Sequence, residues 1–173
     1  MGKILTYLFP LFGLIPFLAA ILHACNDAGC MDNRSSIPFA QFYQKGDLRS
    51  TISVDSLTIY GIGQKNDSLL VDSARSLSSV SLPFRNDDSI TQFVLQYNYD
   101  WNKNRKSNDT LTFIYRPYVY FASVDCGVMF NYTLKEERHT RHILDSVIIV
   151  TPEITNQNIE NIKLVFPAKE NEE

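Results

Sequence analysis

From residue 37 onward, apolar and polar residues alternate in short runs that are separated by clusters of Asn, Asp and Ser. Alternation with a period of two is typical of a strand with one buried face, and the polar clusters are typical of turns. No segment of useful length shows a helical stripe. Strands are therefore predicted at residues 37–43, 51–61, 68–72, 78–84, 90–101, 110–118, 127–135, 145–151 and 161–166.

Many short strands at regular spacing predict an all-β chain. We expect a single antiparallel β-sandwich, plausibly of the immunoglobulin-like type, over residues 37–167. Residues 168–173 form a charged tail. No internal repeat and no interior linker rich in Pro or Gly divides the chain, so a single domain is predicted.

The N-terminus has the anatomy of a secretory signal. Lys3 is followed by an apolar run from Ile4 to Leu22 that would be long enough to cross a bilayer as a helix. Pro10 and Pro16 interrupt this run, because proline removes a helix donor and clashes with the preceding turn. A positive start, an apolar middle and a small-residue end indicate a segment that is removed after export.

The end of this segment, at residues 22–25, resembles a bacterial lipobox, in which lipid is attached to the cysteine before cleavage. His23 departs from the usual small residue. We predict that residues 1–24 are a lipoprotein signal, that Cys25 carries lipid, and that residues 25–36 are a tether. An uncleaved membrane anchor and ordinary secretion remain as alternatives.

Cleavage leaves 149 residues (173 minus 24), which suits one domain, and the loss of Lys3 moves the formal charge from -3 to -4. This mild acidity excludes the basic footprint of most nucleic-acid-binding proteins. We therefore expect the lipid to hold the protein to the membrane. The residue after Cys25 is Asn26 and not the Asp that retains some lipoproteins in the inner membrane, which favours a cell-envelope location at the outer membrane. Only one acid, Asp27, follows Asn26, so no acidic signal for surface export is evident and we expect the protein to face the periplasm.

Only two cysteines remain once Cys25 is lipidated, and an oxidising compartment favours a disulfide between Cys30 and Cys126. Such a bridge closes a loop of 97 residues (126 minus 30, plus one). The chain-entropy model gives it about 4 to 5 kcal/mol of stabilisation. The alternative is a Cys126 nucleophile activated by a histidine, which a disulfide would exclude.

Several short motifs resemble one protein family. They are Cys25 with Cys30 close behind, DSLTIYG at 55–61, SLPF at 81–84, DTLTFIY at 109–115, DCG and FNY within 125–132, and NIENIKLVF at 158–166. Together they look like a family of small uncharacterised lipoproteins of Bacteroidetes-type bacteria, classified as a domain of unknown function. The resemblance implies an envelope location and a β-rich domain, and it brings no catalytic residue.

Asp followed by Ser or Thr and an apolar residue occurs six times, which exceeds the roughly one occurrence expected by chance. The triplets resemble the acceptor sequence for O-glycosylation in the same bacteria. The alternative is structural, since Asp and Ser end turns and an apolar residue opens the next strand. The candidate hydroxyls are Ser56, Ser68, Ser73, Ser89, Thr110 and Ser146, of which Ser68, Ser73 and Ser89 are favoured because their surroundings read as loops.

Aromatic residues could serve a core or a binding platform. Phe93, Leu95 and Tyr97 fall on one face of a predicted strand, together with Tyr99 and Trp101, which favours a core face. Trp101 lies at the mouth of a polar loop. A surface patch of Trp101 with Tyr118 and Tyr120 is therefore our candidate ligand site.

Motifs for catalysis and metal binding are weak. His139 and His142 lack an evident third ligand, so a solvated charged turn is predicted rather than a metal site. Asp87 and Asp88 lack the alternating oxygens and the Gly of a calcium loop. No nucleophile elbow, phosphate loop or dinucleotide motif occurs. We predict no cofactor and no metal, and an enzyme, which would need a cleft of titrating groups, is the least favoured function.

These observations favour a non-catalytic envelope lipoprotein that acts as an accessory or interaction module. The expected partners are the membrane, through the N-terminal lipid, and an envelope protein or a glycan. The alternative is a β-sandwich that binds carbohydrate or another ligand.

Overall fold

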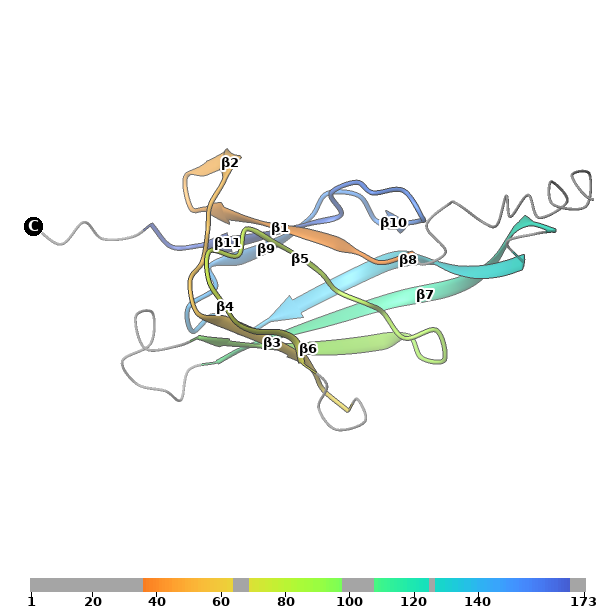
Figure 1. Cartoon of the computed structure of the whole chain (residues 1–173), viewed down its shortest axis with the longest axis horizontal. Helices are drawn as coiled ribbons and strands as arrows, with labels where there is room; N and C mark the ends of the chain where they lie inside the picture. Colours follow the sequence, from red (N-terminus) through yellow and green to blue (C-terminus); the bar gives the residue numbers. More distant parts are fainter. Residues whose placement is uncertain (1–35, 64–68, 98–107, 125–126, 169–173) are drawn as a thin grey trace, which may run out of the picture. The chain divides into compact units, whose positions relative to one another are not determined.

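The computed structural model describes residues 36–63, 69–97, 108–124 and 127–168. Within these ranges the chain forms strands and no helix, and the strands build two sheets that pack together (Figure 1). The predicted all-β sandwich is therefore confirmed. No helix in the described ranges is long and apolar enough to span a bilayer.

The first sheet has the order β2-β1-β11-β9, and β5 pairs with the other part of β1. β1 and β11 run parallel, with Ala40 opposite Ile162, whereas the other described pairs are antiparallel. The antiparallel prediction is thus wrong for this one pair. The strands are β1 (Phe39–Gln44), β2 (Asp47–Thr51), β5 (Ser79–Ser81), β9 (Ser146–Ile149) and β11 (Ile162–Phe166).

The second sheet has the order β10-β8-β7-β6-β3-β4 and is antiparallel throughout its described part. Three successive strands, β6, β7 and β8, lie side by side. This order differs from the ABED and CFG sheets of a constant immunoglobulin domain. The strands are β3 (Leu57–Gly61), β4 (Leu69–Ala74), β6 (Ile90–Tyr97), β7 (Asp109–Ser123), β8 (Gly127–His139) and β10 (Glu153–Ile154).

The core lies between the two sheets and is built by alternate residues of the strands. On β6, the side chains of Phe93, Leu95 and Tyr97 are buried, so the prediction that this aromatic face is core is confirmed there. Each fully buried side chain of this size contributes about 1.5 to 3 kcal/mol. The largest fully buried side chains are Tyr115, Phe42, Phe93, Phe113, Phe166, Leu57, Ile59, Leu82, Leu95, Leu111, Leu144 and Ile154.

Two strands were not predicted from the sequence. Every residue of β2 is exposed, and β10 has only two residues, so neither carries a clear alternation of apolar residues. The predicted strand at 51–61 is correct only from Leu57, because the chain before it makes a single bridge between Val54 and Leu77.

β7 and β8 are longer than predicted, because they pair with each other over almost their whole length. β8 continues through Glu136, Glu137 and Arg138 to His139, where a solvated turn was expected. Pairing with β7 keeps this charged segment extended, since Leu111 lies opposite His139. The prediction of a turn is therefore wrong up to His139.

Candidate functional site

The outer half of the β7–β8 hairpin runs on past the start of β1 (Figure 1). β6 pairs with β7 only as far as Ile114, and β10 pairs with β8 only at Tyr132 and Thr133. β7 and β8 stay paired with each other from Tyr115 to Ser123. A bulge between Ile114 and Tyr115 marks the start of this section. We call residues 117–124 and 127–131 the overhang.

One face of the overhang continues the face that forms the core. Tyr115 and Leu134 lie opposite each other, and both belong to the core. Side chains two positions apart share a face, and so do directly opposite residues. The core-facing side chains of the overhang therefore include Val119, Phe121, Val128 and Phe130. We call these four residues the apolar stripe.

Most of the apolar stripe is exposed. Val119, Phe121 and Val128 have exposed fractions of 62%, 61% and 61%, whereas Phe130 packs against the margin of the core. The same alternation that buries Phe113 and Tyr115 thus continues where these side chains meet solvent. An exposed apolar surface of this kind marks a site of interaction in many proteins.

The opposite face of the overhang carries two tyrosines that the sequence predicted as part of a ligand patch. Tyr118 donates a hydrogen bond to Glu153 Oε2 at 3.4 Å, and Tyr120 is 45% exposed. The two residues are two positions apart and therefore share a face of β7. Trp101, the third predicted member, lies outside the described residues, so the patch as a whole stays a prediction.

The edges of the overhang carry no further strand in the described part of the chain. Pro117 has no N–H and blunts the edge of β7, as prolines do on edge strands of natural sheets. Gly127, with φ +71°, allows the chain to enter β8 in a left-handed conformation. An isolated two-stranded ribbon is only marginally stable, which makes a covering partner favourable here.

The described chain begins beside the overhang. Ser36 Oγ donates a hydrogen bond of 2.6 Å to Asn131 Oδ1, and both residues are buried. The chain then continues into β1 at Phe39. Ser36, the last residue of the predicted tether, therefore lies at the base of the overhang.

Two open hollows of about 470 and 420 Å³ flank the segment Pro83–Asn86. Phe84 and Tyr132 line both of them. The larger hollow extends to Arg85, Asp87 and Leu70. The smaller one extends to Ser36, Ile37, Val128, Met129 and Phe130, so it ends on the overhang.

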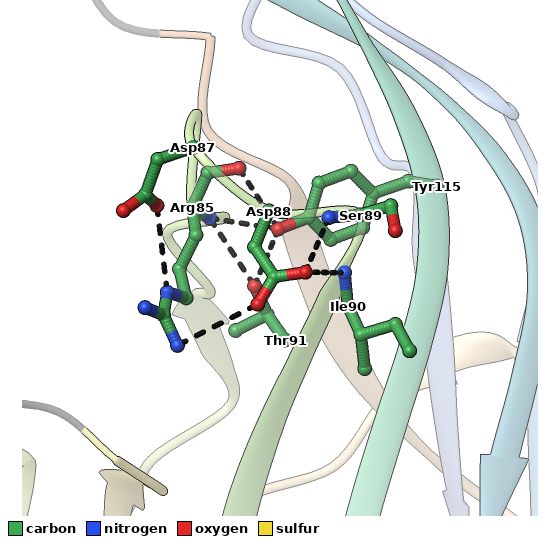
Figure 2. Close-up of polar contacts among 7 residues, drawn as sticks. All are labelled: Arg85, Asp87, Asp88, Ser89, Ile90, Thr91 and Tyr115. Atoms are coloured by element: carbon green, nitrogen blue, oxygen red, sulfur yellow. Dashed lines mark hydrogen bonds and ion pairs between the residues drawn. The ribbon is translucent and has the colours of Figure 1, made fainter.

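Figure 2 shows how the loop between β5 and β6 holds its shape. The Tyr115 hydroxyl accepts a bond from Arg85 N–H, donates one to the Arg85 carbonyl, both at 2.9 Å, and lies 2.6 Å from Thr91 Oγ1. Asp88 Oδ1 accepts bonds from the N–H groups of Ser89 and Ile90 at 2.7 and 3.3 Å. The ring of Phe84 stacks on Tyr115 with centroids 4.3 Å apart.

One guanidinium in this loop faces two carboxylates, so the loop keeps a net negative charge. The Arg85 guanidinium lies 3.6 Å from Asp87 and 3.8 Å from Asp88 (Figure 2). The larger hollow is lined by aromatic rings. The two charged side chains at its edge, Arg85 and Asp87, are paired with each other. This arrangement suits an uncharged polar ligand better than an anion.

Asp109 forms a separate polar centre at the start of β7 and is fully buried. Its Oδ1 accepts bonds of 2.8 Å from Thr140 Oγ1 and from His142 N–H. Its Oδ2 accepts bonds from the N–H groups of Ile143 and Leu144, at 2.9 and 2.7 Å, and from the Tyr97 hydroxyl at 3.0 Å. The carboxylate thus ties the segment after β8 to the ends of β6 and β7.

Burial alone would raise the pKa of Asp109, but the bonds from the backbone of Leu144, His142 and Ile143 and from Thr140 outweigh it and hold the pKa below its usual value. Burial also raises the pKa of Tyr97, and the adjacent carboxylate raises it further. Both groups keep their ordinary charge states at neutral pH. Their role is structural.

The two histidines considered as metal ligands differ in environment. The side chain of His139 is 7% exposed and its Nδ1 lies 2.9 Å from Glu137 Oε2. The side chain of His142 is 50% exposed and its Nδ1 lies 3.0 Å from the Asn108 carbonyl. In the described ranges no three His, Cys, Asp or Glu residues gather in a way that could hold a metal.

The predicted glycosylation sites differ in accessibility. Ser89 is exposed in the loop before β6; Ser73 is also exposed, but the expected loop is wrong there because Ser73 lies within β4. Ser56, Thr110 and Ser146 are half-buried. Ser68 lies outside the described residues, as do Cys25, Cys30 and Cys126, so their predicted roles stay predictions. In four triplets the Asp side chain accepts a hydrogen bond, which gives the pattern a structural use; these residues are Asp55, Asp88, Asp109 and Asp145.

Sequence reasoning missed the apolar stripe and the bonding of Asp109. The predicted strand ended at Tyr118, although the alternation continues through Val119 and Phe121. Extending the period-two pattern would have found the stripe. No local signal indicates that Asp109 differs from the other triplet aspartates.

Neither the curated proteins nor the solved structures contain a match to this chain. A family model does match residues 56–166, which include both strands of the overhang and Asp109. The match covers 111 of the 173 residues (166 minus 56, plus one). The chain therefore belongs to DUF6452, a family of unknown function.

Proposed function

We propose that the protein is a non-catalytic cell-envelope lipoprotein of Bacteroidetes-type bacteria that acts as an accessory or interaction module. The observation that carries this proposal is the exposed apolar stripe. Val119, Phe121 and Val128 continue the core face of the sheet but remain more than half exposed. Keeping such side chains in water is unfavourable, and a partner that covers them gains the free energy of their burial.

The sequence supports the anchoring part of the proposal. Residues 1–24 are the signal, lipid is attached to Cys25, and the protein lies at the outer membrane, facing the periplasm. The proposed Cys30–Cys126 disulfide would connect the tether to the turn of the overhang, because Cys126 lies between Val124 and Gly127 in the chain. The anchor and the interaction surface would then act at one end of the domain.

The buried polar groups support a role without catalysis. The Asp109 carboxylate is occupied by protein donors, and the Tyr115 hydroxyl holds the Arg85 backbone. A catalytic group must instead reach a substrate within hydrogen-bond distance. These groups are held by the fold and serve its stability.

Site-specific photocrosslinking in the native envelope tests the proposal. A photoreactive residue at Phe121 is expected to give an adduct with a protein or a lipid, whereas one at Leu48 on β2, which is also exposed, is expected to give none. Equal yields at the two sites would contradict a role for the overhang. Labelling of the native protein that found no lipid on Cys25 would contradict the lipid anchor.

A second candidate function, binding of a carbohydrate or a similar uncharged ligand, is favoured by the larger hollow. Its floor includes Phe84 and Tyr132, and its rim includes Arg85, Asn86 and Asp87. Aromatic rings and paired polar groups are suited to sugar rings. Binding on a glycan array that is lost in Asn86→Ala would support this function, and the absence of binding by the native protein would argue against it.

A further inference from the structure

We propose that the partner of the apolar stripe is a lipid bilayer, on whose surface the overhang lies as a second contact besides the N-terminal lipid. This inference rests on the proposed lipid anchor and adds what the interaction surface touches. The side chains that enter the interface are Val119, Phe121 and Val128, and Tyr120 points to the opposite side of the ribbon.

The charge distribution favours lipid over protein. The twelve residues 117–124 and 127–130 contain no charged side chain, although charged residues make up 20% of the whole sequence. Asp125, the next residue in the sequence, lies outside the described residues. A surface without charges offers a protein partner little to fix its orientation, whereas a bilayer requires only apolar area.

The position of the overhang also favours lipid. Ser36 is hydrogen-bonded to Asn131 at the base of the overhang. From Cys25 to Ser36 the chain advances eleven residues, which span at most about 36 to 40 Å when fully extended. A lipid on Cys25 would therefore hold Ser36, at the base of the overhang, within about 40 Å of the bilayer surface.

The unpaired edges of the overhang limit how deeply it can lie in the bilayer. Backbone N–H and C=O groups without a partner are costly in hydrocarbon, so the ribbon cannot enter it. In the headgroup region, water and lipid oxygens can satisfy these groups, and an apolar face reaches about 5 to 10 Å into the boundary with the acyl chains. Tyr118 and Tyr120, on the other face, remain in the headgroup region, where tyrosine is enriched.

Tryptophan quenching by brominated lipid tests this placement in the mature lipidated protein. Trp101 is the only tryptophan and is first replaced by Phe. Phe121→Trp and Val128→Trp then report from the apolar stripe, Tyr120→Trp reports from the other face of the same ribbon, and Leu48→Trp on β2 is the distant control. Each variant is incorporated into vesicles of phosphatidylcholine or of brominated phosphatidylcholine, and its far-UV circular dichroism is compared with that of the native protein.

We expect the brominated lipid to reduce the emission of Phe121→Trp and Val128→Trp at least about twofold more than that of Leu48→Trp. Tyr120→Trp is expected to show a smaller loss than Phe121→Trp. Because the contact is apolar, the quenching is expected to persist in 0.5 M NaCl, roughly five times the salt at which exposed charges are already screened over 10 Å.

Equal quenching at Phe121 and Leu48 in protein that is attached to the vesicles would overturn the inference. The proposed interaction module would still stand if photocrosslinking at Phe121 captured a protein or a second copy of this chain. Failure of the mature protein to associate with vesicles would instead count against the lipid anchor itself. Should one stripe variant not fold, the other gives the same comparison.

Discussion

Asp109→Asn keeps the shape of a buried side chain but removes the charge on which five hydrogen bonds converge. The amide oxygen can take only one of the two carboxylate positions. In the better orientation it keeps the bonds from Tyr97, Ile143 and Leu144, and the amide NH₂ then faces His142 N–H. One part-buried backbone donor loses its acceptor, and the remaining bonds lose the contribution of a charged acceptor.

A buried donor without a partner costs about 1 to 3 kcal/mol, and a bond to a charged group contributes about 1.5 to 3 kcal/mol, up to twice a neutral one. We therefore expect Asp109→Asn to lower the free energy of unfolding by about 3 to 5 kcal/mol. This is a large part of the 5 to 15 kcal/mol typical of a domain. Urea unfolding followed by far-UV circular dichroism at pH 7 measures the change.

The matched control is Asp88→Asn, in which an exposed carboxylate loses its charge beside two backbone donors. We expect a cost below about 1 kcal/mol, because water can replace the lost bonds. Equal costs for the two variants would show that the buried bonds of Asp109 do not stabilise the fold as argued.

The difference in unfolding free energy between the native protein and Asp109→Asn should change with pH in one direction only. The pKa of Asp109 is lowered in the folded state, so its charge stabilises the fold at a pH above the unfolded value of about 4. This contribution is lost as the pH falls through the lower folded pKa. The difference in unfolding free energy between native protein and Asp109→Asn should therefore be full at pH 7 and should shrink below about pH 4. A difference that grew with acid would refute the reasoning.

Three further predictions can be tested in the same protein. Tyr115→Phe removes the hydroxyl that holds the Arg85 backbone and should cost about 1 to 2 kcal/mol in urea unfolding, with unchanged circular dichroism; no loss would mean that water replaces it. Peptide mapping without reductant should find Cys30 joined to Cys126, and reduction should lower stability by up to about 4 to 5 kcal/mol; free thiols in the native protein would remove this bridge. The intact mass of native protein should exceed polypeptide plus lipid, and Ser73→Ala with Ser89→Ala should lower it; a mass without sugar would leave the Asp triplets with a structural use alone.

The fold class could be predicted because the alternation of residues is a local property. Phe93, Leu95 and Tyr97 follow one another at every second position, and this spacing places them on one face of any extended strand. β2 could not be found in this way, since all its residues are exposed and its pairing with β1 comes from the backbone. The parallel pairing of β1 with β11 joins segments about 120 residues apart, and no local pattern encodes it.

The sequence by itself determined that the chain is built of strands. It also predicts that the N-terminus is exported and anchored by lipid. The tertiary structure alone decided which apolar residues are covered. Phe113 and Phe121 have the same local pattern, yet Phe113 is fully buried and Phe121 is 61% exposed. The reason is that burial on this face of β7 depends on where the facing first sheet ends. The bonding of Asp109 was likewise decided by the tertiary structure. Its hydrogen-bond donors at 140–144 belong to a segment more than 30 residues away in the sequence, and only the folded sandwich brings this segment next to Asp109.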